Sequence, residues 1–334
     1  MHLSKIALAA LLIAPAALHA QTTKFTSNFS TGERVATGGT YDVGDWTLAS
    51  TKNTTGISYG TGAFTFGMAA TTSGFVEAQN RFSATATTIS NVGEWIELKV
   101  KFTNGSNLLA GGTSSLINIG LFDSGGANPT PGLESSGLTA TDTSPVGSGF
   151  ASGNAQNWEG YVGRFALTGG TNQIYTRAPQ LADATVGGST SENQDLLFSN
   201  VGNGAFDNPS GTQLGTTSTS TQAALSAATQ YTAKLRITVS GASEYTVDYV
   251  LMNGAGDTTL QTLSRTTVSG SFINNLSIDG LAIGYRQSGT SLATSISLNS
   301  VDVTVNAIPE PSSFAALAGL AGLGFAATRR RRAA

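Results

Sequence analysis

The chain has 334 residues, with 17 Lys or Arg, 20 Asp or Glu and no Cys. Its two histidines, His2 and His19, both lie within the first 20 residues. Beyond them the chain has neither an imidazole nor a thiol, which excludes a Ser-His-Asp triad, a Cys-His pair, a histidine-bound metal and any disulfide.

Residues 21–307 carry 12 basic and 19 acidic side chains, a formal charge of −7. No basic stripe is available to bind phosphates, so we expect no nucleic-acid partner. The segment is instead rich in Gly, Thr, Ser and Asn. Such a hydroxyl- and amide-rich composition suits an extracellular protein that lives among sugars.

The first 20 residues have the layout of a secretory signal peptide. Lys5 supplies a basic start, residues 6–18 form an apolar run, and the small Ala20 precedes Gln21. A buried N-terminal helix is the alternative, but a polar Thr/Ser-rich stretch follows the apolar run at once. We therefore predict export, with signal peptidase cleaving between Ala20 and Gln21.

Residues 21–307 contain short strand patterns separated by Gly, Asn, Asp and Ser. Apolar and polar residues alternate along residues 95–102, 231–239 and 245–251. A period of two predicts half-buried antiparallel strands. Four weaker candidates follow the same pattern: residues 117–122, 161–167, 276–285 and 296–305.

In the last two candidates the alternation slips, at Gly280 and at Asn299-Ser300, where a bulge or bend would restore it. Helical patterns are nearly absent, and residues 221–229 fit a single helical turn or a loop equally well. Many short strands without an internal repeat predict one antiparallel β-sandwich over residues 21–307. Residues 124–157 and 180–222 are predicted to be long loops.

Three stretches of this body resemble a concanavalin-type jelly roll. They are residues 94–100, residues 117–123, and residues 231–249 together with 281–285. The resemblance implies a curved sheet whose concave face often holds a saccharide.

From Ile308 the composition changes to a tail of three parts. Pro309, Glu310 and Pro311 stop the last strand. Residues 314–327 are apolar on every side, which predicts a short transmembrane helix rather than an amphipathic helix packed on the body. The tail then ends in a basic block that would stay in the cytoplasm: Arg329, Arg330, Arg331 and Arg332.

This tail, residues 308–334, resembles the PEP-CTERM sorting signal. The resemblance implies that an exosortase in the inner membrane of a Gram-negative-type bacterium cleaves the tail. The body would then reach the cell surface or the exopolysaccharide matrix. The expected partners are therefore signal peptidase, exosortase, the inner membrane for a time, and extracellular polysaccharide.

Glu94 and Glu97 flank Trp95, and a carboxylate pair beside an aromatic ring is what a glycosidase uses. Three residues apart on a strand, the two carboxylates point to opposite faces and cannot flank one bond. The Glu-x-Asp-x-x-Glu pattern of jelly-roll glucanases is missing. We expect solvated strand residues here and no catalytic residue.

Two stretches could supply oxygen ligands for calcium. The first runs from Asp123 to Asn128, and the second is Asp207-Asn208. Neither stretch matches a known calcium loop, and Asp or Asn beside Gly is ordinary turn chemistry. We expect turns at both places, and no metal or other cofactor.

Trp158, Tyr161 and Arg164 follow a polar loop. An aromatic platform beside a guanidinium is what saccharide binding needs. Tyr161 also fits one buried strand face with Phe165, so we expect it in the core. Trp158 and Arg164 are then the candidate glycan-binding residues.

These patterns predict a non-catalytic surface or matrix protein with a structural or glycan-binding role. The alternative is a carbohydrate-active enzyme, a hydrolase or lyase, on the same scaffold. Ice binding is a lesser alternative that rests on Thr abundance. An ice face needs Thr at regular spacing on successive strands, and residues 84–88 are a single Thr-rich occurrence.

Overall fold

The structure is a computed structural model in which the described residues form β-strands and a short 3₁₀ turn, η2 (Asn154–Asn157). It describes residues 20–30, 41–52, 58–59, 62–68, 73–105, 115–129, 154–167, 172–177, 196–197, 211–215, 224–267, 276–288 and 294–307.

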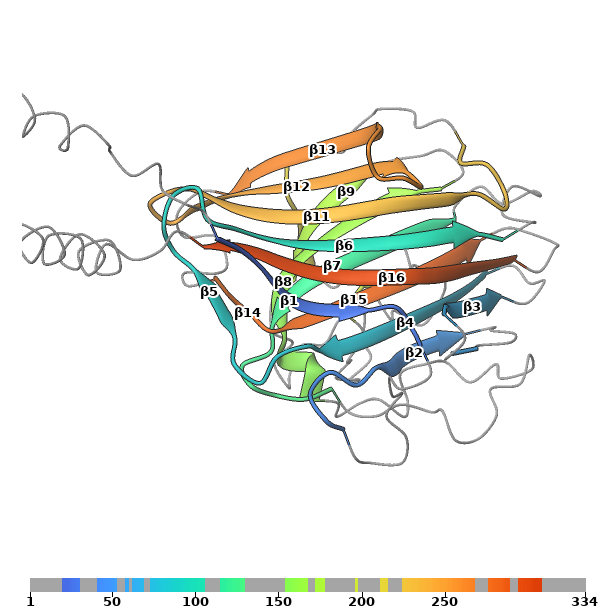
Figure 1. The fold of residues 1–334 in the computed structure, drawn as a ribbon, viewed down its shortest axis with the longest axis horizontal. Coiled ribbons are helices and arrows are strands. Elements are labelled where there is room, and N and C mark those ends of the chain that lie inside the picture. The colour runs from blue at the N-terminus through green and yellow to red at the C-terminus, as the bar shows by residue number, and fades with distance from the viewer. Residues whose placement is uncertain are drawn as a thin grey trace, which may run out of the picture.

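Seven antiparallel strands form the first sheet (Figure 1). Six of them follow one another in the order β1–β16–β6–β11–β12–β13, and β3 also pairs with β16. The bounds in this order are β1 (Ala20–Ser27), β16 (Thr294–Ala307), β6 (Trp95–Asn104), β11 (Gln230–Gly241), β12 (Glu244–Asn253), β13 (Thr259–Thr267) and β3 (Phe64–Met68).

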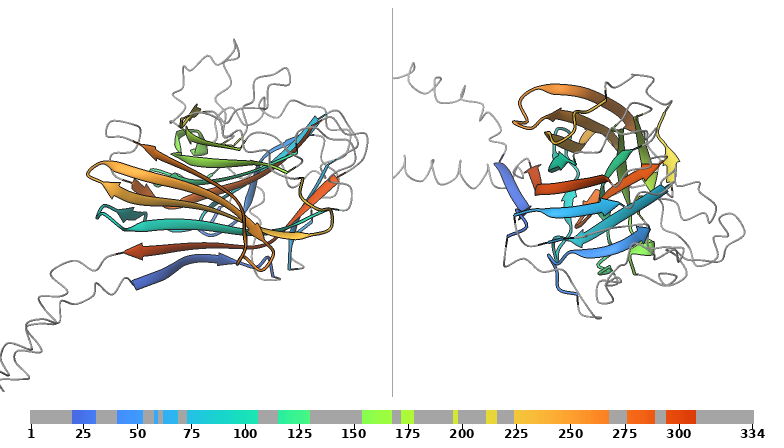
Figure 2. Two further views of the ribbon diagram at one scale, coloured as in Figure 1. Left: turned by 90° about the horizontal axis from the view of Figure 1, so that it is seen from above. Right: turned by 90° about the vertical axis from the view of Figure 1, so that its right-hand side faces the viewer.

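The second sheet also has seven antiparallel strands and lies against the first (Figure 2). Its order is β10 (Gly211–Gln213), β9 (Gln173–Arg177), β8 (Glu159–Ala166), β7 (Leu116–Asp123), β15 (Gly280–Ser288), β4 (Ser73–Arg81) and β2 (Thr47–Lys52). Two short strands, β5 (Thr87–Ile89) and β14 (Leu276–Ile278), pair separately.

One hydrophobic core fills the space between the sheets. Alternate residues of β6, Ile96 and Leu98 among them, face alternate residues of β7, such as Ile119, and all are buried. The rings of Phe165 and Tyr249 stack across the two sheets with centroids 3.9 Å apart. Burying apolar surface on two facing sheets stabilises the fold without disulfides, and the predicted antiparallel β-sandwich is confirmed.

Every strand candidate from the sequence is a strand. The slip predicted at Gly280 is larger than a bulge, because β14 ends at Ile278, β15 begins at Gly280, and the two strands belong to different sheets. The slip in β16 is a register shift against β6 between Leu298 and Ser300. Polar residues thus interrupt the alternation where the chain changes sheet or bulges.

Further predictions concern helices and loops. Residues 224–229 lead into β11 without a helix, and β10 lies inside the segment predicted to be a loop over residues 180–222. In the part of the chain that is described, no helix is long and apolar enough to cross a membrane. The predicted membrane helix, residues 314–327, and residues 1–19 of the predicted signal peptide lie outside that part.

We predict that Gly163→Ala lowers the free energy of unfolding by about 1–3 kcal/mol, the usual cost of overpacking a core. A Cβ at Gly163 would lie 2.5 Å from ring atoms of Tyr249, on the inner face of β8. Urea unfolding measures the change.

The matched control is Gly241→Ala, whose Cβ would meet the Glu244 Cβ at an ordinary 3.4 Å. This variant should unfold at the same free energy or up to about 1 kcal/mol higher. Equal losses in both variants would contradict the packing described for β8.

Candidate functional site

The outer face of the second sheet is covered. A second hydrophobic cluster lies there, outside the sandwich core. It is built from strand residues and from two short segments laid across them: Phe75, Phe122, Ala155, Trp158, Val162, Tyr175, Leu196, Leu197 and Ala282. Both faces of this sheet are therefore buried around its central strands.

Trp158 belongs to this cluster and is fully buried. Its ring packs against Gly280, where an added Cβ would lie 2.7 Å from a ring atom, and its Nε1 donates to the Ala127 carbonyl at 2.9 Å. The ring therefore offers no exposed face for stacking a sugar.

Arg164, the second predicted glycan-binding residue, lies on the same outer face of β8, between Asn118 and Gln173 in the strand register. It is half-buried, and its Nη1 lies 3.5 Å from the Tyr175 hydroxyl. Glycan binding by Trp158 and Arg164 stays a prediction, and the buried indole does not favour it. Tyr161 is buried in the core, as predicted.

Glu77 of β4 binds one of the two covering segments, residues 196–197, to the second sheet. Its Oε1 accepts hydrogen bonds from Gln79 Nε2 at 2.9 Å and from the Leu196 amide at 2.8 Å, and its Oε2 accepts one from the Leu197 amide at 3.0 Å. Complete burial raises the pKa of Glu77 to about 7, although these hydrogen bonds and the Arg177 guanidinium act in the opposite direction. A carboxylate whose oxygens are already engaged has a structural role here.

The predicted turn at Asp123 is confirmed, because its Oδ1 accepts a hydrogen bond from the Gly125 amide at 2.8 Å. Asp279, the residue between β14 and β15, holds the turn by accepting from the Ser124 amide at 2.8 Å and from its hydroxyl at 2.7 Å. Asn128 Oδ1 accepts from Arg81 Nη1 at 2.9 Å.

Asp207-Asn208 lies outside the described residues. Across the described ranges, no three His, Cys, Asp or Glu side chains are grouped so that they could hold a metal ion.

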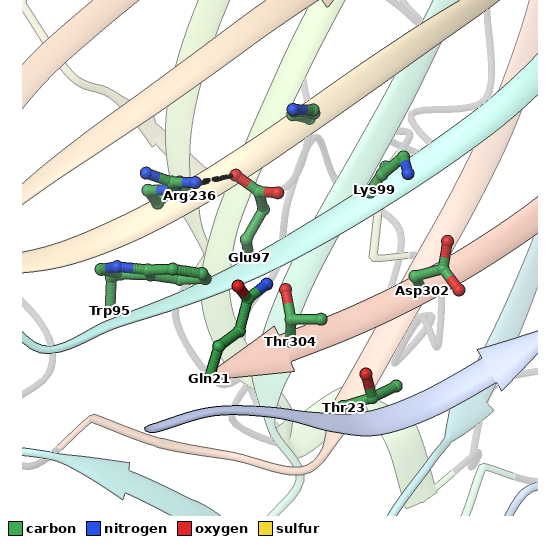
Figure 3. Close-up of a pocket in the computed structure, with 9 residues that line it drawn as sticks. Gln21, Thr23, Trp95, Glu97, Lys99, Arg236, Asp302 and Thr304 are labelled. Atoms are coloured by element: carbon green, nitrogen blue, oxygen red, sulfur yellow. Dashed lines mark hydrogen bonds and ion pairs between the residues drawn. The ribbon is translucent and has the colours of Figure 1, made fainter. Parts of the chain in front are cut away.

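The outer face of the first sheet is open and polar. Alternation along β6 sends Trp95, Glu97 and Lys99 to this face, while Ile96 and Leu98 enter the core. A depression of about 350 Å³ lies here (Figure 3), and we call it the outer pocket. Four strands, β1, β6, β11 and β16, contribute its nine lining residues: Gln21, Thr23, Trp95, Glu97, Lys99, Lys234, Arg236, Asp302 and Thr304.

Arg236 contacts two other residues that line the outer pocket, Glu97 and Trp95. Its Nε and Nη2 lie 2.9 Å and 2.6 Å from Glu97 Oε2, and its guanidinium carbon lies 4.1 Å from the centre of the Trp95 ring. A guanidinium over an aromatic face is an attractive arrangement. In Figure 3 Arg236 covers one side of the indole plane, and Gln21 comes from the other side.

The two carboxylates singled out from the sequence are not solvated, which corrects that expectation. Glu94 is 4% exposed and Glu97 is 8% exposed. Glu94 precedes β6, and its Oε2 accepts hydrogen bonds from the Ser90 and Asn91 amides at 2.8 and 3.0 Å. Glu97 pairs with Arg236 instead, so the two side chains stabilise different places.

Sequence reasoning noticed Trp95 but missed the outer pocket. Its residues lie far apart in the chain and meet only through strand register, in which Glu97 is opposite both Arg236 and Thr304. The sequence feature that could have indicated the outer pocket was the set of polar residues in the alternating segments 95–102 and 231–239.

A row of three threonines crosses part of the same sheet. Thr238, Thr246 and Thr266 are register neighbours on β11, β12 and β13. The next row of β11 and β12 has Arg236 and Asp248. The regular Thr spacing that an ice face needs is therefore not repeated from row to row.

Residues 307–332 match the PEP-CTERM protein-sorting motif. The matched range includes Pro309, Glu310 and Pro311 and the block from Arg329 to Arg332. The tail thus marks the chain for export and exosortase sorting, first as a membrane-anchored precursor and then at the cell surface. A search of curated protein sequences finds no significant match.

Several solved structures are similar in fold. Peanut lectin is 9% identical with a TM-score of 0.39, over 86% of this chain and 98% of the lectin. The Emp47p carbohydrate recognition domain is 7% identical with a TM-score of 0.41, over 86% and 97%. An endo-beta-1,4-glucuronan lyase from the fungus Trichoderma reesei is 11% identical with a TM-score of 0.39, over 86% and 96%. The similarity extends to the fold alone.

We predict that Glu77 makes stability depend on pH. Because its folded-state pKa of about 7 lies above the ordinary 4.5, the folded protein binds this proton more tightly between those pH values. The contribution of Glu77 to the free energy of unfolding therefore falls as the pH rises through this range, by up to about 3 kcal/mol.

Urea unfolding of the wild type and of Glu77→Gln at pH 5 and pH 8 measures this effect. The wild type should lose stability relative to the variant at the higher pH. Parallel pH dependence in the two proteins would show that Glu77 does not titrate in this window.

Proposed function

We propose that this chain is an exosortase-sorted surface protein that binds a saccharide in the outer pocket. The observation that carries the proposal is Trp95, a half-buried indole on a solvent-facing sheet, fixed by Arg236 and surrounded by polar side chains. This site replaces the one that the sequence suggested around Trp158.

The chemistry of the outer pocket suits a sugar. An aromatic ring packs against the apolar CH face of a pyranose, and nearby polar groups bind its hydroxyls. Gln21, Thr23 and Thr304 contribute an amide and two hydroxyl groups to the lining of the outer pocket. Because Glu97 and Arg236 hold each other, little side-chain order has to be gained when a ligand binds.

Binding without catalysis fits the carboxylates of the outer pocket. Glu97 is engaged by Arg236, and Asp302 Oδ1 accepts a hydrogen bond from the Thr26 hydroxyl at 2.6 Å. A glycosidase needs one carboxyl group free to donate a proton and a second one free to attack or to activate water. Neither role suits groups held in this way.

The ends of the body meet beside the outer pocket. Ala20 is the register partner of Ala307, and Gln21 is the partner of Asn306, which also lies opposite Trp95 (Figure 2). The predicted signal cleavage site and the start of the tail thus lie together at one end of the first sheet. The outer pocket takes residues from both ends of the mature body.

We predict that Trp95→Ala weakens saccharide binding by at least tenfold, because it removes the stacking surface. A glycan array on the full chain purified in detergent identifies the ligand, and titration with that glycan measures affinity. Product analysis in the same samples would reveal cleavage, which would contradict the non-catalytic part of the proposal.

Ser264→Ala is the control, since Ser264 is exposed on β13 of the same sheet and does not line the outer pocket. Its affinity should equal that of the wild type. Undiminished binding by Trp95→Ala, or silence on every glycan, would overturn the proposed site.

Deletion of Pro309, Glu310 and Pro311 should leave the chain unprocessed in the membrane fraction, because the exosortase would lose its recognition motif. Immunoblots of membrane and surface fractions from the native bacterium measure the outcome. Unchanged release of a shortened body would contradict sorting through this motif.

A further inference from the structure

We infer that the ligand of the outer pocket is an acidic polysaccharide, a chain that carries carboxylate or sulfate groups. This inference rests on the saccharide-binding function proposed above. It comes from the arrangement of three lysines on β6 and β11.

Lys99 and Lys234 lie directly opposite each other in the β6–β11 register. Opposite residues on one face of an antiparallel pair have Cβ atoms about 5 Å apart, and like charges there are destabilising. An anionic group bound between the two ammonium groups would relieve their repulsion.

Carboxylates are few among the residues directly opposite these lysines. Lys99 has Asp302 opposite it on β16, but Lys234 has Val250 on its other side, on β12. Lys101, the next outward residue of β6, has Thr232 and Ser300 as its register partners.

The remaining carboxylate of the outer pocket is already neutralised, since Glu97 pairs with Arg236. Lys99, Lys101 and Lys234 therefore share Asp302 as the single carboxylate among their register partners in the described sheet.

The positive charge is local. Residues 21–307 have a net charge of −7, yet three of their five lysines occupy this patch. Charges on a protein surface are screened beyond about 8 Å at physiological ionic strength. The lysines therefore act on an anion seated at the sheet.

The spacing indicates a polymer rather than a single sugar. Lys99 lies four positions after Trp95, which corresponds to roughly 13 Å along an antiparallel strand. One pyranose cannot cover both the indole and the lysine pair. A ligand that stacks on Trp95 and also reaches Lys99 and Lys234 needs several linked residues.

The test compares two matched pairs of polymers on the full chain in detergent: polygalacturonate with its carboxyl-reduced form, and dextran sulfate with dextran. We expect at least one acidic polymer to bind at least tenfold more tightly than its neutral partner. The double variant Lys99→Gln/Lys234→Gln should lose at least tenfold in affinity for that polymer. Raising the salt concentration should weaken binding more in the wild type than in the double variant.

Lys24→Gln is the matched control, because Lys24 is exposed on β1 and does not line the outer pocket. It should bind as the wild type does. The double variant should be as stable as the wild type or more stable, since it removes two opposed like charges; this result separates lost binding from lost folding.

Each outcome decides between the two claims. Equal, Trp95-dependent binding of acidic and neutral polymers, unchanged in the double variant, would overturn the acidic ligand and leave the saccharide site in place. Absence of binding to all four polymers would overturn this inference, and failure on the glycan array as well would overturn the saccharide site itself.

Discussion

The alternation of side chains along β6 is the constraint on which the rest of the structure depends. β6 lies between β16 and β11 in the middle of the first sheet, and its inner residues, Ile96, Leu98, Val100 and Phe102, are completely buried. A shift of one residue in this register would turn those four side chains to solvent and send Trp95, Glu97 and Lys99 into the core. Core packing therefore also fixes the position of each residue that β6 gives to the outer pocket.

The two sheets differ in what lies on their outer faces. The second sheet is covered on its outer face by residues 155–158 and 196–197, which the Trp158 indole and the Glu77 carboxylate hold in place. The first sheet has its core on one side only, and its outer side carries a fixed indole, amide and hydroxyl groups, and a group of lysines. Residues that bind a ligand on the outer face of the first sheet do not have to change the core, because successive side chains of a strand point to opposite faces.

Alternation in the sequence was clearest in three strands of the first sheet, whose core lies on one side only. β6, β11 and β12 alternate cleanly, and their bounds agree with the prediction to within a few residues. β4 and β9 were not predicted, because Glu77 and Arg177 are buried in them where a polar residue normally indicates solvent exposure. Trp158 was expected to be an exposed platform, because an indole that follows a polar loop is often exposed. Its packing against Gly280 shows instead that the ring is buried. The outer pocket could not be predicted in this way, because its residues come together only through the pairing of β1, β6, β11 and β16. Alternation within a single strand does not indicate which strands pair.

The proposed saccharide site lies near the end of the first sheet where β1 begins and β16 ends as register partners. The most direct test of the saccharide site is a crystal structure of the chain with an oligosaccharide that it binds. We expect a sugar ring against Trp95, with its neighbours extending along β6 toward Lys99. A sugar bound on the outer face of the second sheet, against Trp158 and Arg164, would contradict it.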